Sequence, residues 1–125
     1  HEGEEAIREL LDALRDGRDV GSVHGLAYLK GGEVVYTPER EPITEFDHLP
    51  LPDFSLVRYA KIKVYPVGRI RGCGMNCEFC TVKSKPRPAS VDRLLRNIRY
   101  LVETHDARHF FIVDDLFGQR GGRLE

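Results

Sequence analysis

Three cysteines lie within eight residues of this 125-residue chain, and this cluster constrains the fold more than any other feature of the sequence. They are Cys73, Cys77 and Cys80. A disulfide framework uses an even number of cysteines spread over the chain, so this odd, clustered set does not form one. Clustered thiols in a reducing compartment usually bind metal. We therefore expect a metal-binding loop held by the segments on either side.

The flanking segments are predicted to form a βαβ unit. Residues 62–70 have the pattern of a strand, in which Pro66 favours an edge position or a bulge. Ser90 suits the N-cap of a helix whose apolar residues keep helical spacing to about residue 104. Residues 110–113 are a continuous apolar run, typical of a strand buried on both faces. Because two parallel strands leave unpaired edges, we expect further βα units in the parent protein.

The first part of the chain has a different organisation. Apolar spacing predicts an amphipathic helix over residues 4–16. Two strand-like runs within residues 25–37 are joined by Gly31-Gly32, which suits a two-residue hairpin loop because glycine adopts positive φ. Four prolines make residues 38–57 an ordered linker, and its apolar residues predict packing against a neighbouring domain. We place a domain boundary between 1–57 and 58–125.

Composition excludes some classes of protein and leaves others open. No run approaches the ~20 apolar residues of a membrane span, and the acidic start is unlike a secretion signal, so we expect a soluble, cytoplasmic protein. The only methionine is Met75, and Leu124-Glu125 is typical of residues added by cloning, which suggests a piece of a longer protein. Residues 58–99 contain 11 basic and 2 acidic residues, so they form either a solvated surface or an anion-facing groove.

The cysteine motif resembles that of the radical S-adenosylmethionine (SAM) superfamily. The segment from Arg71 to Cys80 is a CxxxCxxC with an aromatic residue before the last cysteine. Three thiolates can hold three corners of a cubane cluster and leave the fourth iron open. The resemblance implies that Cys73, Cys77 and Cys80 ligate a [4Fe–4S] cluster and that Phe79 lies near the adenine of SAM. The implied fold is α/β, the first βαβ unit of a radical SAM (β/α) barrel preceded by a helix, a hairpin and the proline-rich linker.

Two acidic residues extend this resemblance. Asp114 and Asp115 follow the second strand, where many members bind the amino group of SAM, although they differ from the commoner Gly-Gly-Glu form. The implied chemistry is a one-electron reduction of SAM that yields a 5′-deoxyadenosyl radical, with the cofactors carrying the reaction. An electron donor such as flavodoxin or ferredoxin would be a partner. Since SAM binding in the family also uses later strands, this chain alone is expected to be inactive.

The linker sequence suggests a subfamily. Residues 49–54, Leu-Pro-Leu-Pro-Asp-Phe, resemble the join to a cobalamin-binding domain in B12-type radical SAM enzymes, which include relatives of the anaerobic magnesium-protoporphyrin monomethyl ester cyclase. The layout is also similar to that of methylthiotransferases. The cobalamin-ligating pattern Asp-x-His-x-x-Gly is absent from the chain, so any cobalamin would be bound elsewhere in the parent protein. The substrate would be a small molecule or tRNA.

Two alternatives from other classes are open. A structural zinc site would need a fourth ligand, which His105 or His109 could supply only if folding brings it to the cysteines. A nucleic-acid-binding module is suggested by the basic segment with interleaved aromatic residues.

Overall fold

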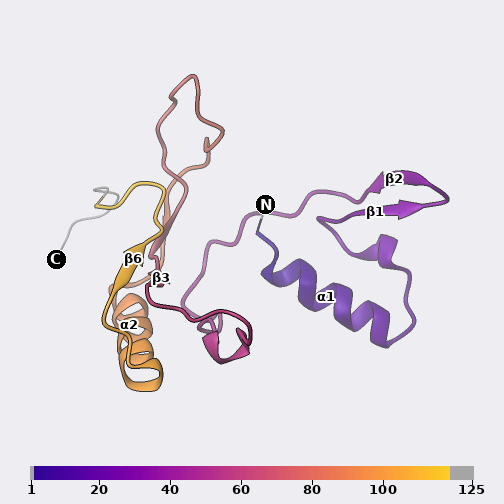
Figure 1. Cartoon of the computed structure of the whole chain (residues 1–125). Coiled ribbons are helices and arrows are strands. Elements are labelled where there is room, and N and C mark those ends of the chain that lie inside the picture. Colours follow the sequence, from indigo (N-terminus) through magenta and orange to yellow (C-terminus); the bar gives the residue numbers. More distant parts are fainter. Residues whose placement is uncertain (1, 119–125) are drawn as a thin grey trace. The chain divides into compact units, whose positions relative to one another are not determined.

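The computed structural model describes residues 2–118 and divides the chain into two compact units, 1–43 and 44–125 (Figure 1). The division falls between Ile43 and Thr44, earlier than the boundary predicted after residue 57. What each unit is within a larger protein stays a prediction. The terminal Leu124-Glu125 lies outside the described residues. Within residues 2–118, no helix has the length and apolar character needed to cross a membrane.

The first unit is a helix followed by a hairpin, as the sequence predicts. Helix α1 spans Glu4–Arg15, the short 3-10 turn η1 spans Val20–Ser22, and strands β1 (Ala27–Lys30) and β2 (Glu33–Tyr36) pair antiparallel. The glycines of the hairpin turn, Gly31 and Gly32, have φ of 62° and 89°. These positive values are the reason that the turn requires glycine.

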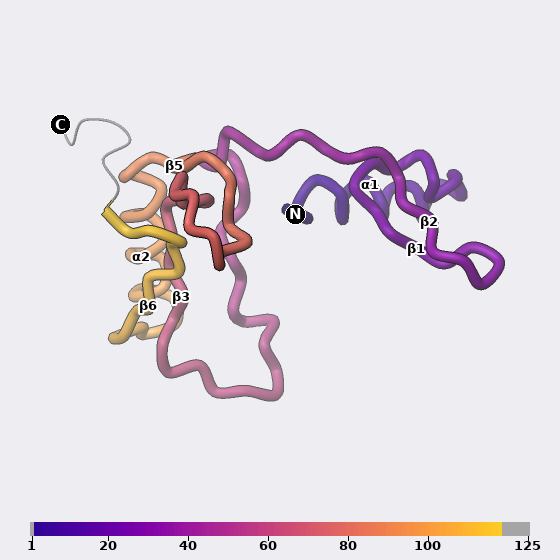
Figure 2. The backbone as a smooth tube through the Cα atoms, turned by 90° about the horizontal axis from the view of Figure 1, so that it is seen from above, coloured from indigo at the N-terminus to yellow at the C-terminus, as the bar shows by residue number. Residues whose placement is uncertain are grey.

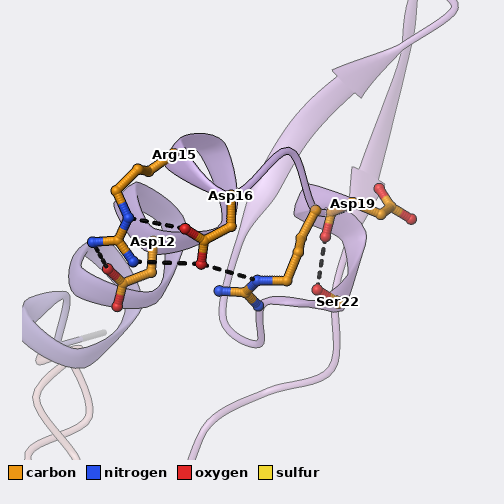
Figure 3. A network of polar contacts seen from close by, with 6 residues as sticks. Asp12, Arg15, Asp16, Asp19 and Ser22 are labelled. Carbon is orange, nitrogen blue, oxygen red and sulfur yellow. Dashed lines mark hydrogen bonds and ion pairs between the residues drawn. The ribbon is translucent and has the colours of Figure 1, made fainter.

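Polar contacts lie at the end of α1 and, separately, within the turn that follows it (Figure 3). Arg15 forms ion pairs with Asp12 and Asp16, at 3.0 and 2.9 Å. The Asp19 carboxylate accepts the N–H of Gly21, and its carbonyl oxygen accepts the Ser22 hydroxyl. Because these side chains are exposed to solvent, the ion pairs add little to stability.

The second unit contains the predicted βαβ arrangement. Strands β3 (Tyr65–Val67) and β6 (Phe110–Ile112) are parallel and joined through helix α2 (Val91–His105), which packs beside them (Figures 1 and 2). The Ser90 side chain accepts the N–H of Arg93 at 3.0 Å, so the predicted N-cap is confirmed. The core of the unit consists of Tyr65, Val67, Leu101 and Ala107.

Three short elements complete this unit, and the first strand is shorter than the sequence predicts. The 3-10 turn η2 spans Phe54–Leu56, and strands β4 (Ile70–Arg71) and β5 (Arg87–Pro88) pair antiparallel. The strand predicted over 62–70 is therefore two strands, β3 and β4, which belong to different sheets.

Strand β6 is not buried on both faces, and that prediction is wrong for the described part of the chain. Phe110 is half-buried, whereas Phe111 is 64% exposed and Ile112 is also exposed. The sheet of β3 and β6 has two strands, and α2 is the helix that packs on it. Because adjacent strand residues point to opposite faces, the exposure of Phe111 and Ile112 leaves both faces of β6 at least partly uncovered within residues 2–118.

Candidate functional site

The three cysteines lie on a loop, residues 72–86, that is closed at its base by β4 and β5. We call this base the neck. Arg71 and Arg87 are partners in the β4–β5 register. The N–H groups of Cys73 and Gly74 both donate to the carbonyl oxygen of Ser84, at 3.2 and 3.1 Å. In Figure 1 the loop extends beyond the β3–β6 pair at the top of the view. The predicted order of strand, cysteine loop and helix is confirmed.

Glycine is required at position 72, where the chain enters the loop. Gly72 has a φ of 83°, a backbone conformation that residues with a side chain rarely adopt. A Cβ at this position would lie 2.6 Å from both the carbonyl oxygen of Lys85 and the Oγ of Ser84. The two sides of the neck therefore approach so closely that only glycine fits between them.

Asp114 and Asp115 bind the backbone of the neck. The Oδ1 atom of Asp114 accepts the N–H groups of Arg69 and Ile70, at 2.7 and 2.9 Å. The Oδ2 atom of Asp115 accepts the N–H of Gly72 at 2.8 Å. These bonds join the residues after β6 to the entrance of the cysteine loop. Their predicted role in binding SAM stays a prediction, and sequence reasoning missed this structural role.

The thiols of Cys73, Cys77 and Cys80 form no disulfide and are half-buried. The N–H of Cys80 donates to the carbonyl oxygen of Cys77 at 3.1 Å, and the Sγ of Cys80 accepts the N–H of Val82 at 3.4 Å. The Lys83 ammonium group also donates to the Cys77 carbonyl. Phe79 is 92% exposed. Its predicted contact with adenine remains a prediction.

The described residues do not place three His, Cys, Asp or Glu side chains close enough together to hold a metal ion. The chemistry of the donor set still fits an iron–sulfur cluster, because three thiols on one short loop can supply three of its ligands. A zinc site has less support. His105 belongs to an aromatic cluster, with ring centroids 5.7 Å from Tyr65 and 5.8 Å from Tyr100. Neither His105 nor His109 joins the cysteines in a metal-binding group within this part of the chain.

Residues 46–50 of the predicted linker lie against the neck and the start of α2. The Asp47 carboxylate accepts the N–H of Ser90 at 2.9 Å. Hydrogen bonds from the Ser90 side chain and N–H lower the pKa of Asp47. Arg93 donates to the carbonyl oxygens of Leu49 and Pro50 at 2.5 and 3.2 Å, and burial lowers the pKa of its guanidinium group. Residues 46–50 of the linker thus belong to the second unit, whereas residues 38–43 belong to the first.

Comparison with known proteins finds relatives over most of the chain. No family model matches it. An uncharacterized methyltransferase from Pyrococcus horikoshii is 33% identical over 93% of this chain and 27% of its own length. An uncharacterized methyltransferase from Synechocystis sp. is 29% identical over 93% of this chain and 20% of its own length. The anaerobic magnesium-protoporphyrin IX monomethyl ester cyclase of Cereibacter sphaeroides is 28% identical over 91% of this chain and 21% of its own length.

A solved structure shares the fold. It is the radical S-adenosylmethionine methyltransferase TsrM from Kitasatospora setae, with tryptophan substrate and a SAM analogue bound. Its TM-score is 0.67 at 16% sequence identity, over 90% of this chain and 24% of that one. This chain therefore spans about a quarter of the length of the proteins it matches. Over most of its length, the chain is therefore similar in sequence to uncharacterized methyltransferases and to the anaerobic magnesium-protoporphyrin IX monomethyl ester cyclase, and in fold to part of a radical SAM methyltransferase.

Proposed function

We propose that Cys73, Cys77 and Cys80 ligate a [4Fe–4S] cluster whose fourth iron binds SAM. The observation that carries this proposal is the set of three thiols, none of them in a disulfide, on one loop closed at its neck. The proposal is supported by the position of the loop, which follows the first parallel strand of a chain whose fold is similar to part of a radical SAM methyltransferase. When bound, the cluster supplies one electron to the sulfonium of SAM.

The residues of the loop have separate tasks in this proposal. Each cysteine binds one iron as a thiolate, which is the form that binds metal. The N–H of Val82 donates to the Cys80 sulfur, and hydrogen bonds of this kind tune the reduction potential of iron–sulfur clusters. Asp114 and Asp115 fix the backbone at the neck, so the loop begins and ends at defined positions.

For the whole protein we propose methyl transfer from SAM, with cobalamin bound outside these residues. The names of the Pyrococcus and Synechocystis relatives favour a methyltransferase. The Cereibacter relative is named as a cyclase, so ring closure on a porphyrin is the second candidate. Both reactions would use the same cluster loop. The substrate would be selected by residues beyond those that this chain shares with its relatives.

The test is anaerobic reconstitution of the 125-residue chain with iron and sulfide. We expect a brown protein with cluster absorption in the visible range. Cys77→Ser should lose most of the bound iron, because a hydroxyl is a poor ligand for this cluster. Met75→Leu is the matched control, since it removes a sulfur from the same loop without removing a predicted ligand. In the full-length parent protein, which would supply the later strands, adding SAM to the reduced cluster should change its electron paramagnetic resonance (EPR) spectrum.

Two results would contradict the proposal. Equal iron and sulfide content in wild type and Cys77→Ser would exclude Cys77 as a ligand. One tightly bound zinc per chain, with no uptake of iron under anaerobic conditions, would support the structural zinc site instead.

A further inference from the structure

The linker segment 46–50 contacts both strands of the neck of the cysteine loop, through Arg71 of β4 and Arg87 of β5. We propose that this segment is a strap that sets the position of the loop, and that Phe46 is the positioning residue within it. The part of this inference that concerns the cluster rests on the proposed function. The part that concerns the neck can be tested without any metal.

The ring of Phe46 lies against one arginine side chain from each strand of the neck. Its side chain is only 5% exposed, although the adjacent residues Glu45 and Asp47 are exposed. The guanidinium carbons of Arg71 and Arg87 lie 4.6 and 5.6 Å from the centre of its ring. Both distances are within the range of cation–π attraction. The ring therefore contacts one residue from each side of the neck.

The remaining strap residues are anchored to the beginning of α2. Asp47 accepts the N–H of Ser90, which lies just after β5. Arg93 donates to three carbonyl oxygens of the strap, those of Asp47, Leu49 and Pro50. A guanidinium group that satisfies three carbonyls fixes the path of a segment that has no strand or helix partners of its own. These hydrogen bonds to the start of α2 hold the segment in place, and with it the position of Phe46 against the neck.

The strap is close to the predicted ligands along the chain. Gly72 alone separates Arg71 from Cys73, and Gly72 is held by Asp115 on its other side. A shift of Arg71 is therefore passed to the first cysteine through one residue. Misplacement of a reacting group by ~1 Å can lower a rate by ~100-fold. We infer that the ring of Phe46 keeps the neck closed and the loop entrance fixed.

The first test measures hydrogen–deuterium exchange of the chain without metal. Phe46→Leu keeps an apolar side chain but removes the aromatic face. We expect the amides of Cys73 and Gly74 to exchange about tenfold faster, as expected for loss of two cation–π contacts and part of a buried ring. Phe46→Tyr keeps the ring and should restore slow exchange.

The matched control is Phe54→Leu. Phe54 is in the same unit and packs edge to face on Tyr65, with ring centroids 5.3 Å apart. The same substitution there should lower the melting temperature without selectively exposing the neck amides. Unchanged exchange at the neck in Phe46→Leu would overturn the strap. So would equal acceleration at the neck in both leucine variants.

The second test uses the reconstituted chain. Phe46→Leu should release iron several-fold faster than wild type and show a broadened EPR signal, whereas Phe54→Leu should resemble wild type at a temperature where both are folded. If the wild-type chain binds no cluster, the proposed function is refuted. The hydrogen–deuterium exchange experiment would still show whether Phe46 stabilises the neck. If wild type binds a cluster and Phe46→Leu has the same iron release and EPR signal, the positioning role is refuted.

Discussion

Gly72→Ala is the sharpest test of how the cysteine loop is closed. The new methyl group would lie 2.6 Å from the Lys85 carbonyl oxygen and from the Ser84 Oγ, and 2.9 Å from the Ser84 carbonyl oxygen. Two of these three atoms are backbone, so the overlap cannot be relieved by a rotamer change alone. That carbonyl of Ser84 is also the acceptor for Cys73 and Gly74. The substitution therefore acts on the hydrogen bonds that define the neck.

The expected magnitude has two parts. A non-glycine residue at the φ of 83° found here costs about 1–2 kcal/mol. Relieving the overlap adds about 1–3 kcal/mol, as for other small-to-large changes at packed positions. We expect a total loss of about 2–5 kcal/mol in the free energy that closes the neck. For a domain whose total stability is about 5–15 kcal/mol, this loss is large.

Gly118→Ala separates the two parts. Gly118 belongs to the same unit and has a φ of 79°, but a Cβ there would meet no atom of residues 2–118 within 4 Å. This control should therefore show only the backbone cost. The assays are urea denaturation and hydrogen–deuterium exchange of the Cys73 and Gly74 amides. Equal losses in the two variants, or unchanged protection at the neck in Gly72→Ala, would refute the steric reasoning.

Three further predictions follow from the same contacts. Asp115→Ala should lower the stability of the neck by about 1–3 kcal/mol, because the Gly72 N–H loses its acceptor. Asp115→Asn should retain most of that stability. Hydrogen–deuterium exchange of the Gly72 amide measures the effect of each variant. The pKa of Asp47 is lowered on folding, so its contribution is present above its ordinary pKa of 3.8 and is lost as the pH falls through the lower folded value. Acid denaturation of Asp47→Asn should lack this component, and an unchanged acid limb would contradict it. The chain should not retain cobalamin through gel filtration, since it lacks the Asp-x-His-x-x-Gly pattern.

The sequence predicts the regular elements well where a local pattern determines them. The helices and the hairpin depend on apolar spacing, an N-cap and a pair of glycines, and all are local signals. The first strand of the second unit was predicted as continuous, but it is interrupted after Val67. Asp114 binds the N–H groups of Arg69 and Ile70 there and turns the chain. A side chain more than forty positions away leaves no trace in the local pattern.

The exposure of β6 has a similar origin. A continuous apolar run predicts burial on both faces, but burial depends on which elements pack against the strand. Within the described residues, β3 pairs with β6 along one edge and α2 packs on β3, so Phe111 and Ile112 stay exposed. The strap was missed for another reason. Phe46 lies in a proline-rich segment without periodicity, and the only signal was an excess of apolar residues there, which was interpreted as contact with a neighbouring domain.

The structure of the loop indicates which part of its conformation is set by folding of the chain and which part by metal binding. The neck is formed entirely by protein groups, namely backbone pairing, two carboxylates and the ring of Phe46. The thiols, in contrast, do not converge into a metal-binding group within the described residues. Three thiolates repel one another, so gathering them without a cation would cost free energy. We infer that the neck limits the loop to a small set of conformations and that cluster binding supplies the free energy for the final convergence. A variant that opens the neck should therefore weaken cluster binding even when all three cysteines are present.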